Sequence, residues 1–242
     1  MIDPRKNIIK ERLKDVGRII AVSGGKGGIG KSIVSTTLAL ILKDMGKKVG
    51  LLDLDFTSPS THVILGERDL PFPEEEKGII PLNIKGLSYL SIVSYTKDNP
   101  TALRGDDLTN AILELFAITR WGKLDYLIMD LPPGIGDVFL ELLRIIEKVE
   151  FLLVTTPSAL SWQTFKKVVD VLKEQNVPII GAILNMVGDA TYGFEKKIEG
   201  KGIKYLGDIS FDKDLEGAIG DTEKLLGTKL SNNLENIVKN TL

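Results

Sequence analysis

Short apolar runs alternate along the chain with longer segments in which apolar residues recur at helical spacing. Apolar runs of strand length, bounded by turn-forming or charged residues, predict buried strands. The runs are residues 18–23, 48–53, 87–94, 124–130, 149–156, 177–185 and 203–209. The stretches between them, such as residues 31–46, predict helices. Such alternation indicates an α/β fold with a doubly wound, mostly parallel sheet and helices on both faces.

The two ends of the chain carry amphipathic segments. Residues 1–17 predict a short lead-in helix, and residues 230–242 place their apolar side chains on one side, as a helix docked on the domain does. A membrane-binding helix would carry several basic residues on its polar face, whereas residues 230–242 have only Lys239. Because no internal repeat or low-complexity linker interrupts the pattern, we expect a single domain over residues 1–242.

Composition excludes several classes of protein. Hydrophobic residues make up 43% of the chain and charged residues 26%, which is ordinary for a globular domain. The formal net charge of −2 provides no general attraction to nucleic acid or to an anionic membrane. The charged N-terminal segment lacks the apolar core of a signal peptide, so we expect a cytoplasmic protein. The chain has no cysteine, which excludes disulfides, cysteine nucleophiles and metal sites built on thiolates.

A glycine-rich loop carries the strongest chemical signal. Residues 23–32 read SGGKGGIGKS and fit the pattern G-x-x-x-x-G-K-[ST] between Gly25 and Ser32, with a predicted strand before and a helix after. In such a loop the backbone N–H groups converge on phosphate oxygens, Lys31 reaches the β- and γ-phosphates, and the Ser32 hydroxyl binds Mg²⁺. The predicted nucleotide-binding residues of this loop are Gly25, Lys26, Gly27, Gly28, Ile29, Gly30, Lys31 and Ser32.

Aspartates follow two of the predicted strands. Asp53 and Asp55 end one of them, and Asp130 ends another. Carboxylates at the carboxyl ends of parallel strands lie where open α/β sheets bind ligands. The alternative for each aspartate is a strand-end cap or a turn residue. Three of them beside a phosphate-binding loop favour a site for Mg²⁺ and a nucleotide.

With Lys26, the loop fits the longer pattern K-G-G-x-G-K-[ST]. Through this pattern the chain resembles the deviant Walker A ATPases, the family of MinD, ParA and Mrp proteins. The resemblance implies a P-loop NTPase of the SIMIBI type that binds ATP, hydrolyses it to ADP and forms an ATP-dependent homodimer. It also implies that Lys31 contacts the nucleotide of its own chain, whereas Lys26 crosses the interface to the partner's nucleotide. The alternative for Lys26 is a solvated lysine in a mobile loop.

The same resemblance assigns further roles. Asp55 orients the attacking water, which makes Lys26, Lys31 and Asp55 the catalytic set. Asp53 and Asp130 contact Mg²⁺ through water. The switch II turn, which senses the γ-phosphate, consists of Pro132, Pro133 and Gly134.

The nucleotide base is assigned in two steps. The sequence lacks the N-K-x-D motif with which guanine-specific relatives bind their base. By the resemblance Asn185 instead reads adenine, and Asp212 lies in the loop on the adenine side. Ser210 replaces the proline that the family usually has in that loop, so the family pattern does not fix the conformation of the loop on the adenine side. ATP and ADP with Mg²⁺ are therefore the expected ligands.

Within the family the chain looks Mrp-like at three places, namely Pro59 and Ser60 after Asp55, the LRG segment at residues 103–105, and DLPPGIGD from Asp130 onward. Mrp proteins hold an iron–sulfur cluster on a C-x-x-C pair just after an N-M dipeptide. Because this chain has no cysteine, no iron–sulfur cluster is expected.

The segments MIDPR, HVILG, FPEEEKG and ITRWGKLDYL resemble the Mrp/MinD-type HypB proteins of archaea. That resemblance implies nickel insertion during [NiFe]-hydrogenase maturation, with a HypA-type nickel metallochaperone as partner. The alternatives are an Mrp-type carrier homologue that has lost its cluster cysteines, and a MinD/ParA-like positioning ATPase that binds membrane or DNA. The single histidine, His62, is a candidate nickel ligand, although a lone histidine is more often structural or a docking contact.

Overall fold

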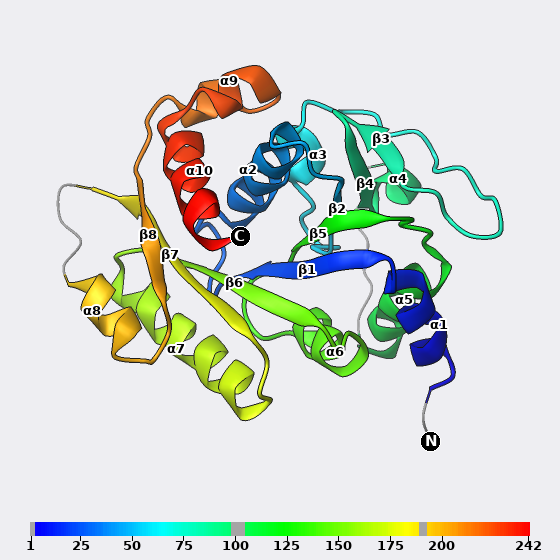
Figure 1. Cartoon of the computed structure of the whole chain (residues 1–242), viewed down its shortest axis with the longest axis horizontal. Coiled ribbons are helices and arrows are strands. Elements are labelled where there is room, and N and C mark those ends of the chain that lie inside the picture. Colours follow the sequence, from blue (N-terminus) through cyan, green and yellow to red (C-terminus); the bar gives the residue numbers. More distant parts are fainter. Residues whose placement is uncertain (1–2, 98–104, 189–192) are drawn as a thin grey trace.

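The computed structural model describes residues 3–97, 105–188 and 193–242, and its centre is a sheet in the strand order β3-β4-β2-β5-β1-β6-β7-β8 (Figure 1). Every neighbouring pair is parallel except β3 with β4. The strands are β1 (Val16–Ser23), β2 (Val49–Asp53), β3 (Leu82–Ile84), β4 (Leu87–Ser91), β5 (Leu124–Asp130), β6 (Val149–Thr155), β7 (Ile179–Val187) and β8 (Tyr205–Ser210). The expected α/β fold with a mostly parallel sheet is confirmed.

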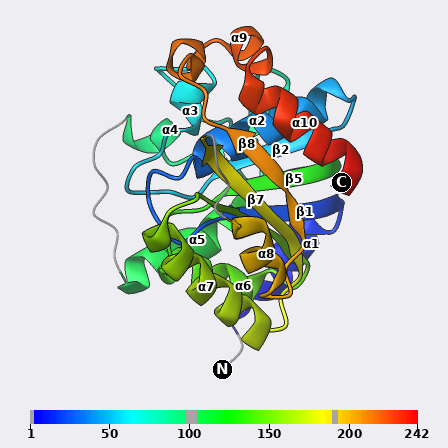
Figure 2. The ribbon, with the colours of Figure 1, turned by 90° about the vertical axis from the view of Figure 1, so that its left-hand side faces the viewer.

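Helices cover both faces of this sheet, as the turned view in Figure 2 shows. One layer holds α2, α3, α9 and α10, and the other holds α1 and α5 to α8. Their bounds are α1 (Arg5–Leu13), α2 (Lys31–Asp44), α3 (Thr61–Ile64), α4 (Val93–Thr96), α5 (Gly105–Ile118), α6 (Asp137–Ile145), α7 (Ala159–Glu174), α8 (Phe194–Glu199), α9 (Thr222–Leu226) and α10 (Lys229–Thr241), with a 3₁₀ turn at Leu215–Ala218.

The two faces of the central strands belong to two separate apolar cores. In β1, Ile19 and Ala21 pack into the core under α1, α5, α6 and α7, whereas Ile20 and Val22 pack into the core under α2 and α10. Successive side chains of a strand point to opposite faces, so a strand buried on both sides must be apolar at every position. This is why the sequence shows continuous apolar runs rather than alternation.

The predicted strand at residues 87–94 differs from the structure. It ends at Ser91 and continues as the short helix α4, and it pairs with a strand that the sequence analysis missed, β3. Lys85 and Gly86 join β3 to β4, and both have positive φ angles, 51° and 82°. Two consecutive residues of this conformation form the turn that suits a tight hairpin. The hairpin makes β3 the only antiparallel member of the described sheet.

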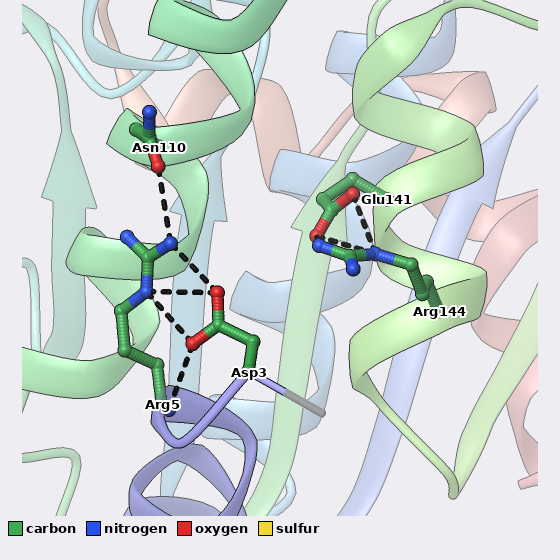
Figure 3. Close-up of polar contacts among 5 residues, drawn as sticks. All are labelled: Asp3, Arg5, Asn110, Glu141 and Arg144. Carbon is green, nitrogen blue, oxygen red and sulfur yellow. Dashed lines mark hydrogen bonds and ion pairs between the residues drawn. The ribbon is translucent and has the colours of Figure 1, made fainter. Parts of the chain in front are cut away.

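Near the two ends of the described chain lie α1 and α10, and α1 is shorter than the expected segment because Val16 and Gly17 belong to β1. On α1, Arg5 is held by Asp3 at 2.7 Å and by Asn110 of α5 at 3.0 Å (Figure 3). The apolar side of α10 is buried against the sheet and α2. Of the LRG segment at 103–105, only Gly105 lies within the described residues, as the first residue of α5. In the described ranges no helix is long and apolar enough to cross a lipid bilayer.

Candidate functional site

The glycine-rich loop joins the end of β1 to the start of α2. Gly28 and Gly30 have φ angles of 73° and 84°, a region that L-residues with a side chain rarely adopt. A Cβ on Gly30 would also lie 2.3 Å from the side-chain nitrogen of Asn185. The loop therefore requires glycine at position 30 on two grounds. Its backbone conformation directs N–H groups at the start of α2 toward the position that an anion would occupy.

Lys31 is the first residue of α2, and only 7% of its surface is exposed. Burial lowers the pKa of Lys31, and the carboxylates of Asp130 and Asp55 oppose that shift. The charges of Asp55 and Asp130 thus act on Lys31, and the roles expected for the three residues stay predictions.

Asp130 lies at the end of β5, in register with Asp53 of β2, and is fully buried. Within the described residues neither of its carboxylate oxygens has a hydrogen-bond partner. Burial, and next the charge of Asp53, raise the pKa of Asp130 to about 7, whereas Ser32 and Lys31 act in the opposite direction. Leaving a buried carboxylate without partners is costly. The charge of Lys31 acts on Asp130, and the carboxylate oxygens remain open to a further ligand such as a metal ion or its water.

These residues fit a magnesium ion. Mg²⁺ takes oxygen ligands, keeps several waters and binds proteins through one or two carboxylates together with substrate phosphates. Asp130 supplies a carboxylate without partners, and Ser32 supplies a hydroxyl beside it. The described ranges contain no cluster of three or more Asp, Glu or His side chains that would chelate a metal by themselves. A metal here would thus depend on water and phosphate oxygens.

Asp53 is engaged by the protein itself. One of its oxygens accepts a hydrogen bond from the N–H of Asp55 at 3.0 Å. The other accepts from the N–H of Ser60 at 3.2 Å, and from the N–H and hydroxyl of Thr61 at 3.1 and 2.7 Å. The Thr61 hydroxyl in turn lies 2.8 Å from the hydroxyl of Tyr89. Asp53 therefore positions the segment after β2, and its expected contact with the water shell of the metal stays a prediction.

Asp55 is half-buried and shapes the turn that follows it. Its Oδ1 accepts from the hydroxyl and N–H of Thr57 at 2.7 and 3.2 Å, and from the N–H of Ser58 at 3.0 Å. Its effect on the pKa of Lys31 places its charge near the phosphate-binding loop. Asp55 thus combines a turn-forming oxygen with a negative charge that acts on Lys31. The water-orienting role expected for it is not tested by these contacts.

Lys26 differs from Lys31 in its exposure to solvent and in its surroundings. It is exposed, and in the described parts of the chain it has neither an ion pair nor a hydrogen bond. A hollow of about 310 Å³ lies beside it, lined by Gly27, Ile29, Ser158 and Met186 among others. A cation in this position is available to a ligand or to another molecule.

The predicted switch II turn is linked to the phosphate-binding loop. The N–H of Gly134 donates to the carbonyl of Gly24 at 3.0 Å, and the N–H of Leu131 donates to that of Val22 at 3.2 Å. Gly134 has a φ angle of 81°, so this contact requires glycine. Pro132 and Pro133 lie between the two hydrogen bonds. Backbone hydrogen bonds therefore join the turn directly to the end of β1 and the start of the loop.

The two residues expected on the adenine side make contacts within the protein. Asn185 is buried, and its amide nitrogen donates to the carbonyl of Ile29 at 2.9 Å. The carboxylate of Asp212 accepts from the N–H of Asp214 at 3.1 Å and from the N–H of Lys229 at 3.2 Å. Both residues support backbone segments beside the site, and their contact with a base stays a prediction. His62 lies buried in α3.

Sequence reasoning missed Thr61 and Tyr89. The only local signal for Thr61 is that hydroxyl side chains at turns and helix starts tend to hydrogen-bond nearby groups. Tyr89 carried no such signal, since it lies on another strand and reads as an apolar core residue.

Replacing Asp130 by asparagine is expected to stabilise the nucleotide-free protein by about 1–3 kcal/mol near pH 8, because it removes a buried carboxylate without partners. The pKa is raised in the folded state, so ionisation of Asp130 costs stability as the pH rises from about 4 to 7. The gain should therefore be larger at about pH 8 than at about pH 5. Thermal unfolding without Mg²⁺ at the two pH values measures it, and an equal gain at both would contradict the burial argument.

Comparison with known proteins agrees with this geometry. A family model described as ParA, NUBPL iron-transfer P-loop NTPase, matches residues 15–241. A protein of Aquifex aeolicus named iron–sulfur cluster carrier protein is 38% identical over 85% of this chain and 61% of its own length. One of the same name from Methanocaldococcus jannaschii is 35% identical over 96% of this chain and 86% of its own.

Among solved structures, a nucleotide-binding protein from Archaeoglobus fulgidus in complex with ADP superposes with a TM-score of 0.75. It is 28% identical, over 95% of this chain and 92% of its own. The chain spans 59 to 62% of the length of the first three curated relatives that it matches. All three are named as iron–sulfur cluster carriers, a different assignment from the HypB class indicated by the sequence segments.

Proposed function

The chain belongs to the ParA family of P-loop NTPases, of the type that includes MinD and Mrp proteins, and from this premise we propose that it is a Mg²⁺-dependent ATPase acting as a dimeric nucleotide switch. The observation that supports it most is the placement of Lys31 and the partnerless Asp130 around a loop that only glycine can form. Such a site binds phosphates and stabilises charge on them.

Each residue has a distinct task in this proposal. The loop N–H groups and Lys31 bind and orient the phosphates, and Ser32 and Asp130 hold the metal ion. Mg²⁺, when bound, neutralises charge on the β- and γ-phosphate oxygens. Asp55 orients the attacking water, while Asp53 and Thr61 fix the segment that carries Asp55. Catalysis in phosphoryl transfer comes chiefly from such positioning and charge stabilisation.

The proposal of a dimer rests on Lys26. Lys31 already serves the phosphates within its own loop, whereas Lys26 is exposed on the outside of the same loop. In a two-fold dimer the same patch of both chains meets, so each Lys26 would face the nucleotide of its partner. There it would stabilise charge on the transferred phosphoryl group as an arginine finger does. The link between Gly24 and Gly134 would transmit closure to the switch II turn.

ATP and ADP are expected to bind more tightly than GTP. The reasons are the absence of N-K-x-D from the sequence and the position of Asn185, whose amide lies against the loop at Ile29. Competition titration against a fluorescent ATP analogue, with and without Mg²⁺, measures the preference. Release of phosphate from ATP in the same samples tests for hydrolysis. GTP binding as tight as that of ATP would contradict the base assignment.

The cargo forms a finer proposal, which rests on the resemblance to HypB-type segments. We propose that nucleotide turnover drives nickel delivery with a HypA-type metallochaperone. Because the chain has no cysteine, a cluster bound through thiolates is excluded from these residues, although relatives carry the name of cluster carriers. Nickel would be held mainly by the partner, since no chelating cluster of three or more acidic or histidine side chains occurs in the described ranges.

Purification of this protein with its partners from native cells, followed by metal analysis, tests the cargo. Co-purification of nickel with a small nickel-binding protein is expected. Iron and sulfide without nickel would contradict the nickel role and favour a carrier homologue without its own cluster ligands.

A further inference from the structure

A second cavity lies far from the phosphate-binding loop. Its volume is about 330 Å³, and it is enclosed by α1, the start of β1 and the end of α6. The strand β1 connects the two places, because Val16 lines the cavity and Ser23 leads into the loop. Ile19 is the last residue of β1 that lines the cavity, so at about 3.3 Å per residue roughly 13 Å of strand separates it from Ser23. The cavity therefore lies near the amino-terminal end of β1, whereas the phosphate-binding loop follows its carboxyl-terminal end.

The floor of this cavity is apolar. Ile9 and Leu13 of α1 form part of this floor, and their side chains are almost fully buried. The remaining apolar lining residues come from β1 and the end of α6, namely Val16, Ile19, Ile145 and Ile146. A volume of this size falls at the lower end of the range, about 300–1,000 Å³, that small-molecule sites occupy. An apolar body would gain by filling it.

The rim of the cavity is basic. Its charged lining residues are Lys6, Lys10, Lys14, Arg144 and Lys148, against a single carboxylate, Glu147. This concentration of positive charge occurs in a chain whose formal net charge is −2.

Three of these cations are already paired. Lys10 pairs with Glu147 at 3.1 Å, Lys14 with Glu11 and Arg144 with Glu141. Lys6 and Lys148 have no ion pair in the parts of the chain that the structure describes. The rim thus retains two cations for which the protein supplies no counter-charge.

The wall formed by α1 is held in place by contacts with α5. Asp3, Arg5 and Asn110 connect the start of α1 to α5, as Figure 3 shows. Hydrogen bonds from Arg5 lower the pKa of Asp3 to about 2, so this pair stays charged at neutral pH. Arg12 adds a hydrogen bond to the carbonyl of Ala117 in α5 at 3.0 Å. Because α1 is attached to α5, the cavity is formed in advance of any ligand.

We propose that this cavity binds a small organic anion with an apolar body, such as an alkyl carboxylate or alkyl phosphate. The alkyl part lies on the floor formed by Ile9, Leu13 and their neighbours, and the anionic group lies at the rim with Lys6 and Lys148. The apolar floor provides most of the affinity and the unpaired lysines select for negative charge. The site shares no lining residue with the phosphate-binding loop and goes beyond the proposed function.

Decanoate and decyl phosphate are suitable probes, because both join an anionic group to a flexible apolar chain. Isothermal titration should show saturable binding of one or both with one site per chain. Decanol, which lacks the charge, and inorganic phosphate, which lacks the chain, should bind at least about tenfold more weakly. The probe that binds more tightly distinguishes a carboxylate from a phosphate ligand.

Two variants test the residues. Lys6→Gln with Lys148→Gln removes the unpaired rim cations and should weaken binding of the anionic probe about tenfold or more. Leu13→Phe narrows the cavity and should abolish binding, provided that thermal unfolding shows a folded protein. Lys47→Gln with Lys167→Gln is the matched control, since it removes two exposed lysines away from the cavity.

Three results would overturn the proposal. They are the absence of saturable binding by both anionic probes, equal binding of decanol and decanoate, and unchanged affinity in the Lys6→Gln/Lys148→Gln variant.

Discussion

Lys26→Ala is expected to bind ATP almost as the unaltered protein does and to lose ATP turnover by on the order of 10³-fold, the size of effect that an arginine finger has in phosphoryl transfer. The reason is geometric. Lys31 is buried within the loop and serves the nucleotide of its own chain, whereas Lys26 is exposed and has no partner in the described residues. Removing Lys26 therefore leaves the binding site of the monomer intact.

The contrasting variant is Lys31→Ala, which should weaken ATP binding itself. Lys47→Ala provides a matched control, because Lys47 is an exposed lysine after α2 and outside the site. Equilibrium binding of a fluorescent ATP analogue and release of phosphate measure the two properties separately. Unchanged turnover in Lys26→Ala would show that this lysine is only a solvated loop residue.

Asp55→Asn is expected to bind ATP and to hydrolyse it about 10²–10⁴-fold more slowly, as loss of a group that positions the attacking water does. Asparagine retains a side-chain oxygen that accepts the hydrogen bonds from Thr57 and Ser58, so the turn after β2 persists. It removes the negative charge that acts on Lys31 and replaces the second carboxylate oxygen, which could accept from water, by a donor NH₂ group. Asp55→Ala removes both the turn contacts and the charge, and it should be at least as slow.

Comparison of the two substitutions separates positioning from chemistry. If Asp55→Asn keeps full turnover whereas Asp55→Ala loses it, Asp55 acts through the turn and the water-orienting role is wrong. Thermal unfolding of both variants shows whether the loss of hydrogen bonds lowers stability.

The sequence predicted those parts of the fold and site that local patterns determine. The central strands were recognisable because burial on both faces makes every position apolar, as in β1. The phosphate-binding loop was recognisable because its lysines and glycines are contiguous. The hairpin at Lys85 and Gly86 carried a weaker signal, since only one of its two turn residues is glycine.

Contacts between distant residues were not predictable in this way. Asn185 donates to the carbonyl of Ile29, which lies 156 residues earlier in the chain. The network of Asp53 with Thr61 and Tyr89 joins two strands, and nothing in the local pattern reveals that both oxygens of Asp53 are already occupied. The physical reason is that such partners meet only after the sheet has formed.

The cargo is a different kind of problem. Phosphate binding places strict demands on backbone and charge, so its residues are recognisable in any member of the family. Recognition of nickel or of an iron–sulfur protein depends on surfaces and partners that the nucleotide site does not determine. A few residues of the sequence are therefore enough to identify the family and the nucleotide site, whereas they do not identify the pathway.

The most direct test of the proposed dimeric switch is a mixture of Lys26→Ala and Asp55→Asn chains, each of which is expected to be at least about 10²-fold slower alone. In a mixed dimer, one site combines an intact Asp55 with a Lys26 supplied by the partner. Random mixing should therefore restore about a quarter of the turnover per chain of the unaltered protein, because half of the dimers carry one complete site. No recovery of activity, although cross-linking shows that mixed dimers form, would contradict the proposal that Lys26 acts across the interface.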